Sequence, residues 1–238
     1  MSHYKSCLRN ASLALAALLP LAAQAQDRPA PPPDTMDARV MACAACHGDK
    51  GAGLPNSYFP RIAGRPASYL YEQLRAFRDG ERSYAPMNAL IAYLPDEYLQ
   101  RMADYYAKQN PPFPARTTPK VSAAVLARGQ TLATKGDAAR GIPACASCHG
   151  ANFSGVEPGI PGLLGLGSTY LSSQLGEFRT GNRHGRQPDC MTTVATKLSN
   201  SDISAVSAWL ATQPKPADAM PNPQTAVSLP LTCGSQAR

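Results

Sequence analysis

Apolar residues recur with a helical period in two separate stretches, one in each half of the chain. The two sets are Leu70, Leu74 and Phe77, and then Leu171, Leu175 and Phe178. Positions i, i+4 and i+7 lie on one face of an α-helix, so each set predicts a helix with one buried face. Gly80 and Gly181 follow the two sets closely and are placed to end those helices in the left-handed conformation.

The remaining pattern also predicts helices. Further helices are expected over residues 35–43, 96–109, 122–133 and 202–213. Ser199, followed three residues later by Asp202, resembles a capping box at the start of the last of these. No segment shows the alternation of a half-buried strand, so the predicted fold class is all-α.

The two halves of the chain repeat each other. Residues 60–80 align without a gap on residues 161–181, and Pro, Gly, Tyr-Leu, Gln-Leu, Phe-Arg and Gly recur in the same places. Further on, Tyr105 falls on Trp209. We therefore expect a duplication that forms two tandem domains.

Composition sets the expected boundaries between these domains. They are a first domain over 34–109, a proline-rich linker over 110–120, a second domain over 121–213 and a proline-rich tail over 214–238. The linker should be extended and semi-rigid. We expect the tail to lie over the surface of a domain.

The first 25 residues have the pattern of a secretory signal peptide. Lys5 and Arg9 precede an apolar run over residues 11–19, and Ala23-Gln24-Ala25 is a small-x-small cleavage site, so cutting is expected after Ala25. The run is too short for a comfortable transmembrane helix, although an uncleaved anchor is the alternative. We expect at most peripheral association with a membrane.

Two copies of Cys-x-x-Cys-His indicate the chemistry. They are Cys43, Cys46 and His47 in the first half, and Cys145, Cys148 and His149 in the second. Two thiols three positions apart can each bond a haem vinyl group, and the adjacent histidine then becomes the proximal ligand of the iron. The alternatives are a zinc site or a thioredoxin-like redox site, which use Cys-x-x-Cys without the histidine.

Covalently bound haem would also explain how domains of this size fold. Each half is small for an unaided hydrophobic core, and a haem is a large apolar body around which short helices can pack. Covalent attachment takes place outside the cytoplasm, which agrees with the signal peptide and predicts the bacterial periplasm. We therefore expect two covalently bound haem c groups.

The sixth ligand of each iron determines whether it transfers electrons or binds small molecules. Met87 and Met191 lie at equivalent places in the repeat, each in a predicted loop between two helices. A thioether there can ligate the iron and raise its reduction potential. The alternatives are that either Met fills the core, as expected for Met102, or that His184 ligates the second iron.

Two cysteines remain when the signal peptide, with Cys7, and the haem attachments are removed. They are Cys190 and Cys233, an even pair in an oxidising compartment, where cysteines usually form disulfides. The alternatives are an intermolecular disulfide or a thiolate ligand from Cys190 to the iron. An intramolecular bond would tie the tail to the residue beside Met191.

The charge of the chain excludes nucleic acid as a partner. The formal net charge is +7, and the excess is dispersed rather than arranged in a stripe. One local cluster contains Arg179, Arg183, His184 and Arg186. It is either a solvated loop, a surface that steers an acidic redox partner, or a set of groups that neutralise haem propionates.

The order of these motifs resembles class I cytochrome c, and the two copies in one exported chain resemble the dihaem cytochrome c4 family. The likeness covers roughly residues 36–213. It implies an all-α fold and a periplasmic electron carrier, not an enzyme, whose partners are a dehydrogenase, a cytochrome bc complex or a terminal oxidase. The chain departs from the family pattern where Asp189-Cys190 precedes Met191, and in its longer tail with Cys233.

Two other functions are compatible with the same motifs. A cytochrome subunit bound permanently to a periplasmic dehydrogenase would have almost the same residues. A dihaem peroxidase would need an open iron site with acid–base groups beside it. His184 is the one imidazole of the mature chain outside the haem motifs, which disfavours the peroxidase.

Overall fold

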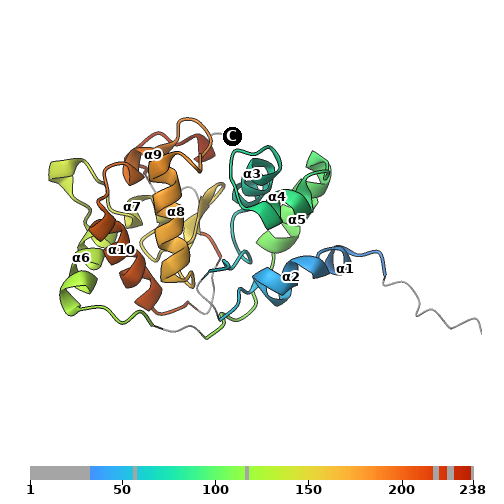
Figure 1. The fold of residues 1–238 in the computed structure, drawn as a ribbon, viewed down its shortest axis with the longest axis horizontal. Helices are drawn as coiled ribbons and strands as arrows, with labels where there is room; N and C mark the ends of the chain where they lie inside the picture. Colours follow the sequence, from blue (N-terminus) through green and yellow to red (C-terminus); the bar gives the residue numbers. More distant parts are fainter. Residues whose placement is uncertain (1–32, 56–57, 116–117, 217–219, 224–227, 237–238) are drawn as a thin grey trace, which may run out of the picture. The chain divides into compact units, whose positions relative to one another are not determined.

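The computed structural model describes residues 33–55, 58–115, 118–216, 220–223 and 228–236 (Figure 1). The predicted signal peptide lies outside these residues. None of the helices in the described segments has the length and apolar character needed to cross a membrane.

Helices make up the first half of the structure. They are α1 (Met36–Arg39), α2 (Met41–His47), α3 (Ala67–Arg78), α4 (Ala85–Ile91) and α5 (Asp96–Ala107), with a short 3-10 helix, η1 (Asp49–Gly51). The single helix expected over residues 35–43 is wrong in its bounds. The chain breaks at Val40, which caps α1, and α2 then continues through the first Cys-x-x-Cys-His motif to His47.

Packing of α3 against α5 forms the core of this half (Figure 1). Leu70 and Phe77 supply the predicted apolar face of α3, and Leu99 and Ala103 on α5 are completely buried against it. Met102 is also buried in this core, as its place inside a helix predicts. Cys43 of the first Cys-x-x-Cys-His motif packs against this core, so the two helices lie next to the motif.

The second half repeats this plan with one addition. Its helices are α6 (Ala123–Thr134), η2 (Ala138–Arg140), α7 (Ala146–His149), α8 (Ser168–Thr180), α9 (Cys190–Ala195), α10 (Asn200–Thr212) and η4 (Gly234–Gln236). The addition is an antiparallel pair, β1 (Gly155–Val156) and β2 (Ile160–Pro161). The expectation of no strand was therefore wrong here, because strands of two residues are too short to show alternation.

A glycine allows α6 and α10 to pack closely in this half (Figure 1). A Cβ atom built on Gly129 of α6 would collide with the backbone of Ala205 on α10. Ala205 is itself buried, so two small residues meet where the helices approach each other.

The helix ends follow the sequence signals. Gly181 ends α8 in the left-handed conformation, with φ 74° and ψ 16°, and Gly80 has a φ of 81° two residues beyond the last residue of α3. The capping box at Ser199 and Asp202 is also confirmed, since each side chain accepts a hydrogen bond from the other residue's backbone N–H.

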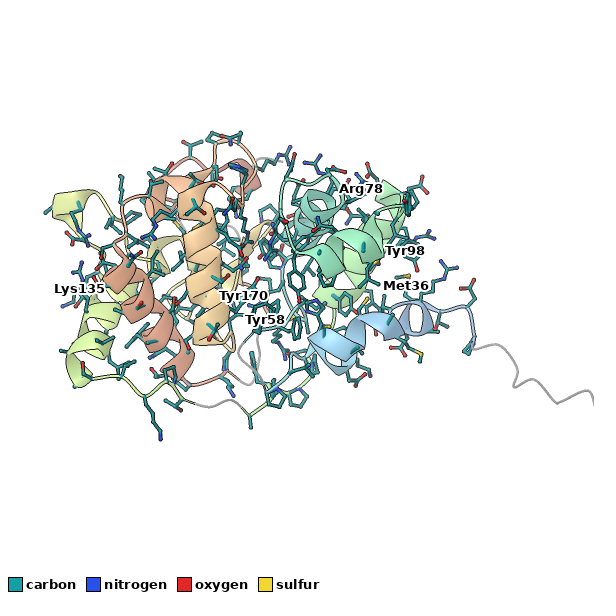
Figure 2. The ribbon with its side chains drawn as sticks, viewed as in Figure 1. Met36, Tyr58, Arg78, Tyr98, Lys135 and Tyr170 are labelled. Atoms are coloured by element: carbon teal, nitrogen blue, oxygen red, sulfur yellow. A yellow bond between two sulfur atoms is a disulfide. The ribbon has the colours of Figure 1, made fainter. Side chains whose placement is uncertain are left out.

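Equivalent residues of the two halves meet in a cluster that we call the interdomain latch. Its members are Tyr69, Gln73 and Arg82 from the first half, and Tyr170, Gln174 and Arg183 from the second. Arg183 donates to the Gln73 amide oxygen at 2.7 Å and to the Tyr69 hydroxyl at 3.1 Å. Arg82 donates to the Gln174 amide oxygen and, at 3.2 Å, to the hydroxyl of Tyr170, which is labelled in Figure 2.

The latch corrects the expectation for the basic cluster around Arg183. Arg183 is 4% exposed and lies over the Phe178 ring, so it cannot steer a partner from the surface. Arg179 donates to the carbonyl oxygen of Leu198 and to the Asn200 side chain, which joins two helices of its own half. Arg186 is exposed, so the four residues do not form one docking surface.

Asp202 gives the second half a pH-dependent stability. Burial alone would raise its pKa, but hydrogen bonds from Arg140, Ser199 and Arg128 outweigh burial and hold the pKa of Asp202 well below its usual range. A carboxyl group with a lowered pKa in the folded state stabilises the fold above its unfolded pKa, which is about 4. That stabilisation is lost as the pH falls below this value.

We therefore expect Asp202→Asn to lower the free energy of unfolding by about 1–3 kcal/mol at pH 7. The difference from the unsubstituted protein should shrink as the pH is lowered below about 4. Urea denaturation at pH 7 and at a pH below about 4 measures this difference. Glu97→Gln, at an exposed position of α5, is the control. A difference that stays constant across this pH range would contradict the account.

Candidate haem sites

One continuous cavity of about 660 Å³ extends through both halves of the described structure. Apolar side chains make up most of its lining, among them Phe77 and Phe178 from the two predicted stripes. Both Cys-x-x-Cys-His motifs line it, and so do Met87 and Met191. All eight residues predicted to hold haem therefore face the same space.

The motif cysteines lie on short helices beside this cavity. Cys43 and Cys46 are on α2, and Cys148 is on α7, with Cys145 at its N-cap. Burial raises the pKa of the Cys43 and Cys148 thiols, and raises that of Cys145 to about 12. These thiols are therefore protonated, unlike the low-pKa thiolates of redox-active cysteines.

The motif histidines are oriented for a bond to iron. His47 Nδ1 lies 3.0 Å from the carbonyl oxygen of Pro60, and His149 Nδ1 lies 2.7 Å from that of Pro161. An Nδ1–H that donates to a carbonyl leaves Nε2 free as a ligand. Burial is the main cause that lowers the pKa of both imidazoles, which favours the neutral form that binds metal.

The two methionines lie on helices rather than in the loops expected from the sequence. Met87 is on α4 and Met191 is on α9, and both side chains are half-buried at the cavity. Asp189 caps α9, accepting from the backbone N–H of Thr192 at 3.0 Å. In the first half, Pro86 lies in the first turn of α4, directly before Met87. Where the chain departs from the family pattern before Met191, the helix begins instead with the Asp189 cap.

A disulfide joins Cys190 to Cys233, with the Cα atoms 5.2 Å apart. This is the pairing expected from the cysteine count. Gly234 donates its backbone N–H to the Pro188 carbonyl oxygen, and Asn222 donates its backbone N–H to that of Gly155. The described parts of the tail thus contact the second half, and the disulfide ties them to the start of α9, the helix that carries Met191.

Three of the four buried arginines at the site were not predicted from the sequence, and the fourth, Arg183, belongs to the basic cluster for which neutralisation of haem propionates was one expectation. Arg61, Arg65, Arg82 and Arg183 are each at most 7% exposed and line the cavity. Among the described residues, no carboxylate lies within ion-pair distance of any of them. In the alignment of the two halves, Arg82 falls on Arg183, and this repetition is the one sequence signal for a shared role. Arg61 and Arg65 fall on Gly162 and Leu166, so the repeat gives no signal for them.

Their unpaired N–H groups fit haem propionates. Arg61 Nε and Nη2 and Arg183 Nε are buried and have no hydrogen-bond partner in the described structure. A buried guanidinium without an acceptor is costly, and a carboxylate is its natural partner. Apolar lining, paired thiols, an oriented imidazole and a thioether complete a donor set that fits one haem in each half.

Comparison with known proteins agrees with this donor set. A family model described as "Cytochrome c" matches residues 126–214, and one described as "Cytochrome C oxidase, cbb3-type, subunit III" matches residues 34–105. Cytochrome c4 of Pseudomonas aeruginosa is 35% identical over 73% of this chain and 84% of its own. The chain belongs to the dihaem cytochrome c4 family. It is therefore an electron-transfer cytochrome with two covalently bound haem c groups.

Other relatives extend the range of the family. A "Thiosulfate dehydrogenase electron acceptor" of Thiomonas intermedia (strain K12) is 38% identical over 74% of this chain and 80% of its own. The crystal structure of reduced recombinant cytochrome c4 from Pseudomonas stutzeri matches with a TM-score of 0.62 and 32% identity, over 74% of this chain and 95% of that one. The two-domain fold is thus shared across most of both chains.

The disulfide generates a prediction about the second half. Cys233→Ser should lower the free energy of unfolding by about 4 kcal/mol, because the bond closes a loop with a sequence separation of 43. Thiol labelling of the unfolded, unreduced monomer should find no free cysteine before the substitution and one after it. Ser235→Ala, two residues along, is the matched control. A labelled thiol in the unsubstituted monomer would contradict this assignment.

Proposed function

We propose that this cytochrome is a periplasmic electron carrier in which both irons have histidine and methionine ligands. His47 and Met87 would hold the first haem, attached through Cys43 and Cys46, which we call haem one. The observation that carries the proposal is that each half presents an imidazole and a thioether to the same cavity.

The second haem would be held in the same way. Its attachment residues would be Cys145 and Cys148, and its ligands His149 and Met191; we call it haem two. When bound, each haem takes up and releases a single electron at its iron. The protein's part is to keep both axial positions filled, to exclude water and to raise the potential through the thioether ligand.

The same arrangement disfavours a peroxidase. Both halves have a thioether at the cavity that can fill the sixth position of the iron, so neither iron would have an open position. His184 is exposed and lies outside the lining of this cavity. A peroxidase needs an acid–base group beside its open site. We therefore infer that the protein has no substrate chemistry of its own.

The names of its relatives support a dehydrogenase as electron donor. Two thiosulfate dehydrogenase electron acceptors, from Thiomonas intermedia and Stutzerimonas stutzeri, are 38% and 37% identical to this chain. A thiosulfate dehydrogenase (TsdBA) from Marichromatium purpuratum contains a matching part with a TM-score of 0.64, which covers 36% of that chain. We infer that a periplasmic dehydrogenase, with thiosulfate dehydrogenase as the first candidate, reduces this cytochrome and that a terminal oxidase reoxidises it.

Export completes the proposal. The pattern that ends at Ala25 is that of a signal peptide, and haem attachment through paired cysteines needs an extracytoplasmic compartment. Periplasmic location and cleavage after Ala25 are thus part of the proposed function. N-terminal sequencing of the purified holoprotein should begin at Gln26.

The methionine ligands can be tested directly. Met87→Ala should open haem one to carbon monoxide and remove half of the Met-to-iron charge-transfer absorbance, because only one of two equivalent thioethers is lost. Carbon monoxide titration of the reduced protein should then show one binding site per chain. Met102→Leu, a conservative change at a buried Met in the same half, should leave both properties unchanged.

Carbon monoxide binding by the unsubstituted protein would contradict methionine ligation. Two rapidly filled sites per chain would mean that neither thioether holds its iron, and the peroxidase would become the better account.

Electron transfer from the donor is tested with purified partners. Thiosulfate with a thiosulfate dehydrogenase should reduce both haems, at a rate that rises with enzyme concentration, whereas thiosulfate alone should not. A quinol with a cytochrome bc complex provides the second donor. Reduction by neither donor would contradict the carrier role. Isolation in a fixed ratio with a dehydrogenase subunit would favour the alternative, a permanent subunit.

A further inference from the structure

Arg65 belongs to the first half, but its side chain enters the second. Its Nη2 donates to the Leu164 carbonyl oxygen at 3.3 Å, and the residue is 5% exposed. A Cβ atom built on Gly162 would collide with Arg65 Nη1. The glycine therefore leaves the space that this guanidinium occupies.

The segment that Arg65 contacts is the one that orients the proximal histidine of haem two. Pro161 accepts the hydrogen bond of His149 at 2.7 Å, and Gly162 is the next residue. Gly64, just before Arg65, donates its backbone N–H to the Tyr106 carbonyl oxygen at 3.0 Å, and Pro66, just after it, is the N-cap of α3. The backbone at Arg65 is therefore held from the first half while its charge lies beside the second site.

The repeat shows that this contact runs in one direction. The latch arginines Arg82 and Arg183 are equivalent, so each half receives the same charge from that pair. Arg65 falls instead on Leu166, which is buried and uncharged. At the position equivalent to Arg65, the second half therefore places no charged side chain beside the first.

We propose that Arg65 of the first half raises the reduction potential of haem two. Ferric haem carries one more positive charge than ferrous haem, so a fixed, buried positive charge favours the reduced form. If a propionate accompanies the guanidinium, loss of Arg65 leaves that anion uncompensated, and the direction of the effect is the same. The first half thereby biases an internal electron toward haem two.

The inference rests on the proposed function, since it takes both irons to be ligated by His and Met. Arg65→Gln removes the charge, Arg65→Lys keeps it, and Arg65→Leu installs the residue found at position 166. Arg101→Gln, at an exposed position of α5, is the control with the same change in net charge. Each is made in the Met87→His background, where haem one titrates at lower potential and the upper wave belongs to haem two.

Spectroelectrochemical titration of protein with two haems per chain gives the result. The midpoint of haem two should fall in Arg65→Gln and Arg65→Leu by at least tenfold in the reduction equilibrium, which is 59 mV for one electron. Arg65→Lys and Arg101→Gln should stay near the reference, and the charge-transfer band of haem two should be unchanged in all four.

The proposal is overturned if haem two keeps its midpoint without the charge, or if Arg65→Lys falls as far as Arg65→Gln. It is also overturned if neither neutral variant assembles haem two, because Arg65 would then be needed for structure. Failure of the proposed ligation is seen separately, as absence of the charge-transfer band before any substitution at Arg65.

Discussion

Packing around haem is the constraint on which both halves of this structure depend. Each half is small, so the hydrophobic core that its side chains bury is correspondingly limited. The buried stripes of α3 and α8 face a common cavity rather than filling it, and Phe77 and Phe178 contribute to its wall. Helix positions, histidine orientation and the buried arginines all follow from enclosing that group.

Most of the helical plan could be predicted because its signals are local. The period of Leu171, Leu175 and Phe178 needs only one helix to be meaningful, and the Ser199 capping box acts within a single turn. The cysteine motifs are also local signals, because all their residues lie within five positions of the chain. The spacing of two thiols and an imidazole specifies one chemical group whatever surrounds it.

The missed features depend on contacts between distant parts of the chain. Arg183 resembles a surface residue by its neighbours, Asn182 and His184, and its burial depends on latch residues of the first half as well as on Phe178 of its own half. The β1–β2 pair is too short to have a period. Placing Met191 on a helix required the Asp189 cap, which is visible in the sequence but has no meaning until the helix is known.

Duplication explains both the symmetry of this cytochrome and its departures from symmetry. The latch uses the same three residue types from each half, so the halves meet as equivalent partners. Arg65 and the Cys190–Cys233 disulfide break that equivalence, and both act on the second half. Two copies of one domain can in this way hold two haems with different properties.

The central claim is that one haem is bonded to each half through its own pair of cysteines. Mass spectrometry of proteolytic peptides from the mature holoprotein tests it most directly. The account predicts one haem on the peptide with Cys43 and Cys46, and one on the peptide with Cys145 and Cys148. Unmodified thiols at either pair in the purified holoprotein would contradict it.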